Sequence, residues 1–517
     1  MPSADGYGRG PAGVTLTIEE IWEKDALGSR GGEGIGMKYD STRRNILKAT
    51  AASLAMVGIP GALEESGLAE IVTQYNYAPR QRNVPLGIAR GIHPGRVVWV
   101  RDPKASRWSG HRESESDQWW MDGSTDQARV DAMVSLLIQQ VTGANTDHEA
   151  WKAIFNYFGQ RYGKMKERVY RAGEIVAVKV NLNNSKPMVP TNLVNVSPQV
   201  ALAVVRQLVH QAGVAPRDIV VYDAQRDIYP GLLNKIWNEY KDIRFVQRDT
   251  PDPEHQAHPG YGKVQGLEQA HWVEGQTYSA NHYDNARFIP QQIKDATYLV
   301  NVALVKGHSY PFAAAEGGDE GQTGVTLTGK NHFGSIKGPG ELHGIINTNQ
   351  GGTPHAYSPI VDLSASPNLG AKTILYLLDG LYCARRHMSY PLHFPNAPFF
   401  NRVQPYENPE WPASILASLD GVALDSVGLD ILYSQTKNNA DENGHPRIMI
   451  RENADDYLIE EAQPENPPSG THYRQDGKPV ESLGVFEHWD SEESRKYSRN
   501  IDPEHATGIE LIYIERV

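Results

Sequence analysis

Cysteine is almost absent from this chain, and its scarcity excludes several kinds of site. The 517 residues include a single cysteine, Cys383, within the sequence LDGLYCARR. One thiol cannot form an intrachain disulfide, and it cannot build a cysteine-ligated iron–sulfur cluster or a structural zinc site. Any bound metal must therefore use His, Asp, Glu, Asn or backbone oxygen ligands. We expect Cys383 to be a small buried residue rather than a nucleophile.

Excess positive charge and long apolar runs are also lacking. The net charge is −12, and no basic stripe with interleaved aromatic residues occurs, so we expect no nucleic-acid partner. The run from Ala49 to Ala62 is too short and too rich in alanine for a stable membrane span. A composition of 39% hydrophobic and 22% charged residues is ordinary for a soluble globular protein.

The N-terminal region has the composition of an extension followed by an export signal. Residues 1–36 are glycine-rich and polar, and we expect them to be disordered. Within residues 37–70, the sequence STRRNILK from Ser41 to Lys48 precedes a mildly apolar run and resembles the twin-arginine export motif. This predicts recognition by the twin-arginine export machinery and a periplasmic or extracellular location. The alternative is an amphipathic helix with a chance arginine pair, and both the true start at Met37 and signal cleavage stay open.

Short apolar runs alternate with amphipathic segments over residues 71–455. Strands are expected in the following segments: 96–101, 174–182, 218–223, 299–305, 372–379 and 508–515. Helices are expected from Thr125 or Asp126 to Val141, over 151–161, and from Pro198 to Gly213. The pattern predicts an α/β fold with a mostly parallel sheet, flanking helices and long loop insertions. We expect residues 456–517 to form a polar C-terminal extension that packs on this domain.

Polar residues bracket one glycine-rich loop in residues 295–337. The buried run LVNVALV ends at Lys306 and His308, and after the loop the chain reads Lys330, Asn331, His332. The carboxyl ends of strands in open α/β sheets commonly hold ligands, so these residues are site candidates. We predict catalytic roles for His308, Lys330 and His332, and substrate-binding roles for Lys306 and Asn331. The alternative is a solvated turn, with His332 bonded only to backbone.

Two earlier predicted strands also end in polar residues. Lys179 and Asn181 share one face of the strand EIVAVKVNL, and both are predicted to bind substrate. A lysine in a central strand needs an anion or a carboxylate, so a structural ion pair with Asp223 is an equal alternative for Lys179. Asp223, at the end of DIVVYDA, and Asp425 are candidate ligands for a divalent metal. The four histidines within residues 250–290 lack ligand spacing, and a solvated loop is expected there.

The order of six segments resembles the domain of unknown function 362 family. These segments are VKVNLNN, DIVVYDA, ATYLVNVALVKGH, VTLTGKNHFGSI, ILYLLDGL and LDGVALDSVGLDIL, which together span roughly residues 174–435. The family's lysine and asparagine strand falls on Lys179 and Asn181, and its later strand end falls on Asn301, Lys306 and His308. Its K-N-x-x-G segment falls on residues 330–334 and its D-x-x-A-x-D segment on residues 420–425. Many members carry ferredoxin-like clusters, which the single cysteine excludes here.

A more distant likeness is to the catalytic domain of nickel-pincer lactate racemases. That resemblance implies proton transfer by two histidines and a lysine that tethers the cofactor, for which His308, His332 and Lys330 are the candidates. We expect an exported enzyme that acts on a small anionic substrate, with a divalent metal as a candidate cofactor. The alternatives are a noncatalytic envelope protein that binds a metal, anion or partner, and a racemase or isomerase with a nickel-type cofactor.

Overall fold

The structure is a computed structural model in which residues 78–517 form one compact unit. It describes residues 81–111, 114, 116–163, 168–183, 193–251, 253, 264–308, 324–343, 356–384, 389–391, 393, 411–435, 450, 454–491 and 493–516. The predicted disordered extension and export signal lie outside these residues. Within the described residues, no helix is both long enough and apolar enough to cross a membrane.

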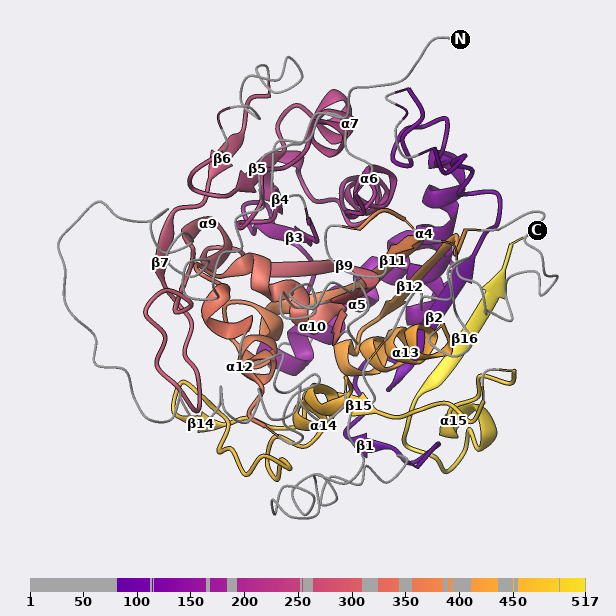
Figure 1. The fold of residues 1–517 in the computed structure, drawn as a ribbon, viewed down its shortest axis with the longest axis vertical. Coiled ribbons are helices and arrows are strands. Elements are labelled where there is room, and N and C mark those ends of the chain that lie inside the picture. The colour runs from indigo at the N-terminus through magenta and orange to yellow at the C-terminus, as the bar shows by residue number, and fades with distance from the viewer. Residues whose placement is uncertain are drawn as a thin grey trace, which may run out of the picture. The chain divides into compact units, whose positions relative to one another are not determined.

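A ten-stranded sheet organises the unit (Figure 1). Nine of its strands lie in the order β16 (Glu510–Glu515), β2 (Arg96–Arg101), β12 (Ser414–Ser418), β11 (Thr373–Ala384), β9 (Tyr298–His308), β3 (Val176–Val180), β4 (Ile219–Tyr222), β5 (Arg244–Gln247) and β6 (Leu267–Gln269). The tenth, β10 (Gly324–Thr326), pairs with β9 outside this order. The six strands from β11 to β6 are parallel, and β12 is antiparallel to both of its neighbours. The predicted α/β fold with a mostly parallel sheet is therefore confirmed.

Helices cover both faces of the sheet because its strands are apolar on both sides. One buried cluster joins the sheet to α4 (Gln127–Thr142), α5 (Asp147–Gly163), α6 (Pro198–Arg206) and α7 (Pro230–Glu239). The cluster on the other face includes α12 (Pro359–Ala365), α13 (Gly421–Ser434) and α14 (Asp456–Ala462). Figure 1 shows α6 and α7 on one side of the sheet and α12, α13 and α14 on the other.

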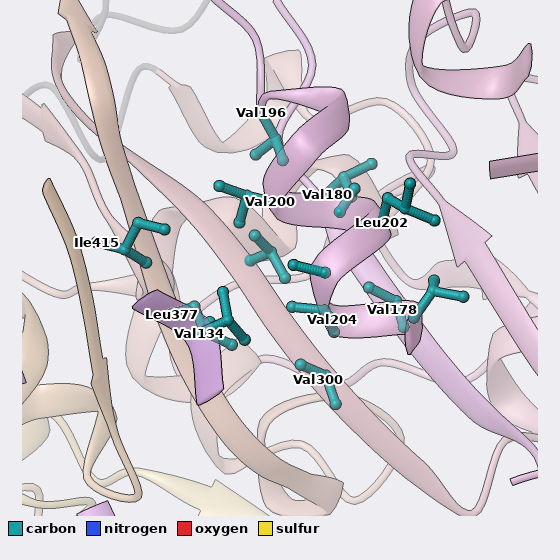
Figure 2. Packing of buried hydrophobic residues seen from close by; sticks show 14 of the residues in the cluster. Val134, Val178, Val180, Val196, Val200, Leu202, Val204, Val300, Leu377 and Ile415 are labelled. Carbon is teal, nitrogen blue, oxygen red and sulfur yellow. The ribbon is translucent and has the colours of Figure 1, made fainter. Parts of the chain in front are cut away.

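Helix α6 illustrates how local sequence places a helix on the sheet. The Ser197 hydroxyl accepts a hydrogen bond from the Val200 backbone N–H, so it caps the helix N-terminus. Figure 2 shows Val200 and Val204 of α6 packed with Val178 of β3 and Val300 of β9 in one buried cluster. This helix forms the crossover between parallel strands β3 and β4.

Strand β9 is longer than the sequence indicates. It extends to His308, because β10 (Gly324–Thr326) pairs antiparallel with its last three residues, 306–308. Lys306 lies opposite Thr326 and His308 lies opposite Gly324, so both side chains belong to the sheet rather than to a loop beyond it. The prediction that the strand stops at Val305 was wrong.

The C-terminal residues complete the sheet. Strand β16 pairs in parallel with β2 along its whole length, from Glu510 opposite Arg96 to Glu515 opposite Arg101. Part of the segment expected as an extension is thus an edge strand of the sheet. The remaining short elements are β1 (Leu86–Gly87), β7 (Trp272–Glu274), β8 (Phe288–Pro290), α9 (Gln291–Lys294), β13 (Arg474–Gln475), β14 (Lys478–Pro479), β15 (Val485–Phe486) and α15 (Ser498–Ile501).

Candidate functional site

The strand order reverses between β3 and β9. From β3 the chain proceeds through β4 and β5 in one direction, and β9 then returns to the opposite side of β3. In open α/β sheets, ligands bind beyond the carboxyl ends of strands at such a reversal. The short helix α10 (Thr328–Asn331) and the following 3₁₀ turn (His332–Ser335) lie there, with α10 in contact with β9, α12 and α13.

Asn331 joins the two strands on either side of the reversal. Its Oδ1 accepts hydrogen bonds from Lys179 Nζ at 3.1 Å and Asn181 Nδ2 at 3.0 Å, both from the β3 side. Its Nδ2 donates to Asn301 Oδ1 at 2.7 Å and to the Val302 carbonyl at 3.1 Å, both on β9. The structure thus brings together Lys179, Asn181 and Asn331, and these bonds hold α10 against the sheet.

Lys179 forms the ion pair with Asp223 that the sequence left open. Lys179 Nζ lies 3.1 Å from Asp223 Oδ2, and the lysine side chain is 0% exposed. Burial lowers the pKa of Lys179, while the attraction of Asp223 acts in the opposite direction. Gly334 packs on this pair, and a Cβ atom there would lie 2.5 Å from Lys179 Nζ and 2.8 Å from both Asp223 oxygens. Only glycine fits so close to the two charged groups.

Asp425 accepts hydrogen bonds from the first residues of α10. Its Oδ1 accepts bonds from the Thr328 N–H at 2.8 Å and hydroxyl at 2.7 Å, and its Oδ2 accepts from the Gly329 N–H at 3.0 Å and the Tyr457 hydroxyl at 3.2 Å. Burial is the largest cause that raises the pKa of Asp425 to about 6. Glu461 lies beside it, and burial followed by repulsion from other carboxylates raises its pKa to about 8.

The described residues do not fit a metal centre. Among them, no group of three or more His, Cys, Asp and Glu side chains is placed to hold a metal ion. Asp223 binds Lys179 and two backbone N–H groups, and Asp425 binds α10 as described above. The metal-binding role of these two aspartates stays a prediction without a third ligand in this part of the chain.

Three basic side chains gather at the end of β9, and we refer to Lys306, Lys330 and Arg226 as the cation cluster. Lys306 is 1% exposed and its Nζ donates to Thr326 Oγ1 at 2.8 Å. Lys330 is 4% exposed, and its Nζ lies 4.1 Å above the Phe333 ring. Among the described residues, no carboxylate forms an ion pair with any member of the cluster.

The three charges repel one another. Burial is the main cause that lowers the pKa of Lys306 well below its ordinary value, followed by repulsion from Lys330 and Arg226. Burial, with a contribution from Arg226, also lowers the pKa of Lys330 to about 7. An anionic ligand would stabilise the charged forms of these two buried lysines beside the partly buried Arg226.

Two imidazoles adjoin the cation cluster. His343 Nε2 lies 3.2 Å from Lys330 Nζ, and the His343 ring stacks on His308 with 5.5 Å between the ring centroids. His308 Nδ1 lies 3.1 Å from Thr326 Oγ1, the same hydroxyl that Lys306 contacts. Of the predicted residues, His308, Lys306 and Lys330 therefore come together.

His332 occupies a different position. Its Nε2 accepts a 3.4 Å hydrogen bond from Asn301 Nδ2, and its Nδ1 has no hydrogen-bond partner among the described residues. Burial, followed by repulsion from Lys179, lowers its pKa to about 3. A group with so low a pKa is poorly matched to proton transfer near neutral pH. Its catalytic role stays a prediction, and the geometry favours His308 over it.

Sequence reasoning missed Arg226, Thr326 and His343. Arg226 follows Asp223 by three residues at the end of β4, so the strand-end rule that selected Asp223 could have included it. Thr326 and His343 carried no signal of their own. Each belongs to the site because it contacts a lysine on another segment: Thr326 contacts Lys306, and His343 contacts Lys330.

Comparison with known proteins gives a family without a defined reaction. Searches of curated proteins and of solved structures each found no match to this chain. Residues 176–430 match the family model described as Domain of unknown function (DUF362). The match includes every predicted site residue, the cation cluster and His343. The region that builds the site is therefore similar to the DUF362 family.

Proposed function

We propose that the protein is an enzyme that binds a small anionic substrate at the cation cluster. The observation that carries the proposal is the grouping of Lys306, Lys330 and Arg226 with no paired carboxylate among the described residues. A buried cation without a counter-charge is costly, and a bound carboxylate or phosphate would supply that charge. Arg226 offers a planar fork of donors, and the lysines act as point charges.

The adjoining imidazoles support catalysis rather than simple binding. His343 contacts Lys330, and His308 stacks on His343 beside Thr326. Imidazole is the side chain best suited to move protons near neutral pH. Because the described residues offer no metal-binding group, the proposal includes no step on a metal. Anion binding without any turnover would favour the noncatalytic alternative.

Small anions are expected to raise the thermal stability of the protein, and Lys306→Met is expected to abolish that response. At an anion concentration about one hundred times Kd, binding contributes about 2.7 kcal/mol to the free energy of unfolding. Differential scanning fluorimetry and calorimetric titration with phosphate, sulfate and short carboxylates would measure it. Without an anion, Lys306→Met should unfold at an equal or higher temperature, because it removes an unpaired buried cation.

Lys372→Met is the matched control. Lys372 is also buried, but its Nζ donates to the carbonyl groups of Ile293 at 2.6 Å and Ala296 at 2.9 Å. Its replacement should lower stability and leave the response to anions intact. If both variants keep that response, or if no small anion stabilises the wild-type protein, the proposed site is wrong.

We further propose that the protein is exported through the twin-arginine route. The support is the sequence STRRNILK, in which Arg43 and Arg44 precede an apolar run. Replacing both arginines with lysine keeps the charge but removes the pair that the receptor reads. In cell fractionation, the double variant should accumulate in the cytoplasm and the wild-type chain in the envelope or medium. Equal distribution of the two proteins would refute the export proposal.

A further inference from the structure

We propose that Lys330 is a nucleophile that forms an imine with a carbonyl-bearing anionic substrate of the 2-oxo acid class. This inference rests on the proposed function, because the anion site would hold the substrate carboxylate. It adds a reaction type that neither anion binding nor the family match implies. The argument uses three features of the described residues: the surroundings of Lys330 Nζ, the orientation of His343, and the position of the other two cations.

The surroundings of Lys330 Nζ favour a neutral amine. The lysine is almost completely buried, so its charged form loses most of its hydration, and the cation–π contact with the Phe333 ring 4.1 Å from Nζ offsets only part of that loss. No carboxylate pairs with it in the described part of the chain, whereas Arg226 repels its charged form. Lysines become nucleophilic in this way, by desolvation or by the neighbourhood of another cation. By contrast, Lys179 is tied to Asp223 and Asn331 and is unsuited to the same role.

His343 is oriented to move the protons that imine formation requires. Its Nδ1 lies 2.9 Å from the Pro339 carbonyl, and a carbonyl oxygen can only accept, so Nδ1 carries a proton. In the neutral ring, Nε2 then presents its lone pair to Lys330 Nζ at 3.2 Å. The amine and a proton acceptor are thus in hydrogen-bond contact before any substrate arrives.

The chemical step balances with these groups alone. The Lys330 amine adds to the substrate carbonyl carbon, forming the C–N bond, and the amine proton passes to His343 Nε2. His343 returns that proton to the oxygen, which gives the carbinolamine. The second amine proton then passes through His343 Nε2 to the hydroxyl, which leaves as water as the C=N bond forms. Lys306 and Arg226 would hold the adjacent carboxylate, which fixes the carbonyl carbon near Lys330.

The test is reductive trapping with the full-length purified protein. Pyruvate, oxaloacetate and 2-oxoglutarate are supplied in turn with sodium cyanoborohydride, and intact mass and peptide mapping follow. We expect one reduced adduct per chain, located at Lys330. Lys330→Arg should lose the adduct, because a guanidinium stays protonated and does not add to a carbonyl carbon. Lys478→Arg, at an exposed lysine, is the matched control and should trap like the wild-type protein.

The outcomes separate this inference from the proposed anion site. Trapping at Lys330 supports the imine, and His343→Gln should then slow it by about 100-fold, the ordinary effect of losing a general base. Adducts spread over exposed lysines, or no adduct with any 2-oxo acid while phosphate still stabilises the protein, overturn the imine alone. Peptide mapping of the wild-type adduct decides the question even if the Lys330 variant does not fold. Loss of every anion response would overturn both proposals.

Discussion

Replacing Lys179 with methionine is expected to lower the free energy of unfolding by about 3–5 kcal/mol, the usual cost of breaking a buried ion pair from one side. The variant leaves Asp223 buried without its cation, and it removes one of the two donors to Asn331 Oδ1. Since Asn331 joins β3 to β9, the loss should extend to the position of α10. Urea denaturation at neutral pH, monitored by circular dichroism, measures the change in the free energy of unfolding.

A double-mutant cycle with Asp223→Asn isolates the ion pair. The asparagine keeps one oxygen, which can accept from either the Gln225 or the Leu182 N–H group, and it removes the buried negative charge. We expect the double variant to lose clearly less stability than the two single variants added together, because each single variant leaves one buried charge unpaired and the double variant leaves none. Strict additivity would mean that Lys179 and Asp223 do not interact, which would contradict the geometry.

The scaffold was predictable where folding depends on neighbouring residues in the chain. Strands β3, β9 and β11 are runs of apolar residues, because both faces of a parallel sheet are covered. Helix α4 was predictable from Asp126, whose side chain accepts from the Arg129 N–H, and from Val130, Val134 and Leu137 at helical spacing. These signals are local, so they survive in the sequence alone.

Elements held by distant partners gave no such signal. Strand β10 has only three residues, and it forms because β9 extends beyond its apolar run to pair with it. Helix α10 has four residues, too few for a periodic pattern, and its start is fixed by Asp425. A four-residue helix is not stable by itself, so its own sequence does not predict it.

The same distinction applies to the site. The substrate-binding residues predicted from the sequence include Lys179, Asn181 and Asn331, which lie together in the structure, but the sequence could not show that these side chains hydrogen-bond to one another. Which cations remain without a carboxylate depends on pairs made across the fold. Arg226 joins Lys306 and Lys330 because the segment after β4 docks on the turn after α10, where the Ala224 N–H donates to the Gly334 carbonyl at 2.8 Å.

The second large effect is expected from Glu461, beneath α10, as a dependence of stability on pH. Burial raises its pKa from an ordinary 4.5 to about 8, so the folded protein keeps a proton that the unfolded chain has lost over that interval. Stability from this group is therefore complete below about pH 4.5 and declines as pH rises toward 8. The total decline is on the order of a few kcal/mol.

Glu461→Gln should remove this contribution, because an amide does not titrate. We expect the wild-type protein to lose stability relative to the variant between about pH 4.5 and about pH 8, as measured by urea denaturation at each pH. Glu461→Asp keeps a carboxyl group and should retain a downward slope. Parallel curves for the wild type and Glu461→Gln would mean that the folded protein does not hold the proton. Glu461 would then be a carboxylate in the folded protein, beside Asp425 and Gly329. Its negative charge would offset part of the positive charge of the cation cluster.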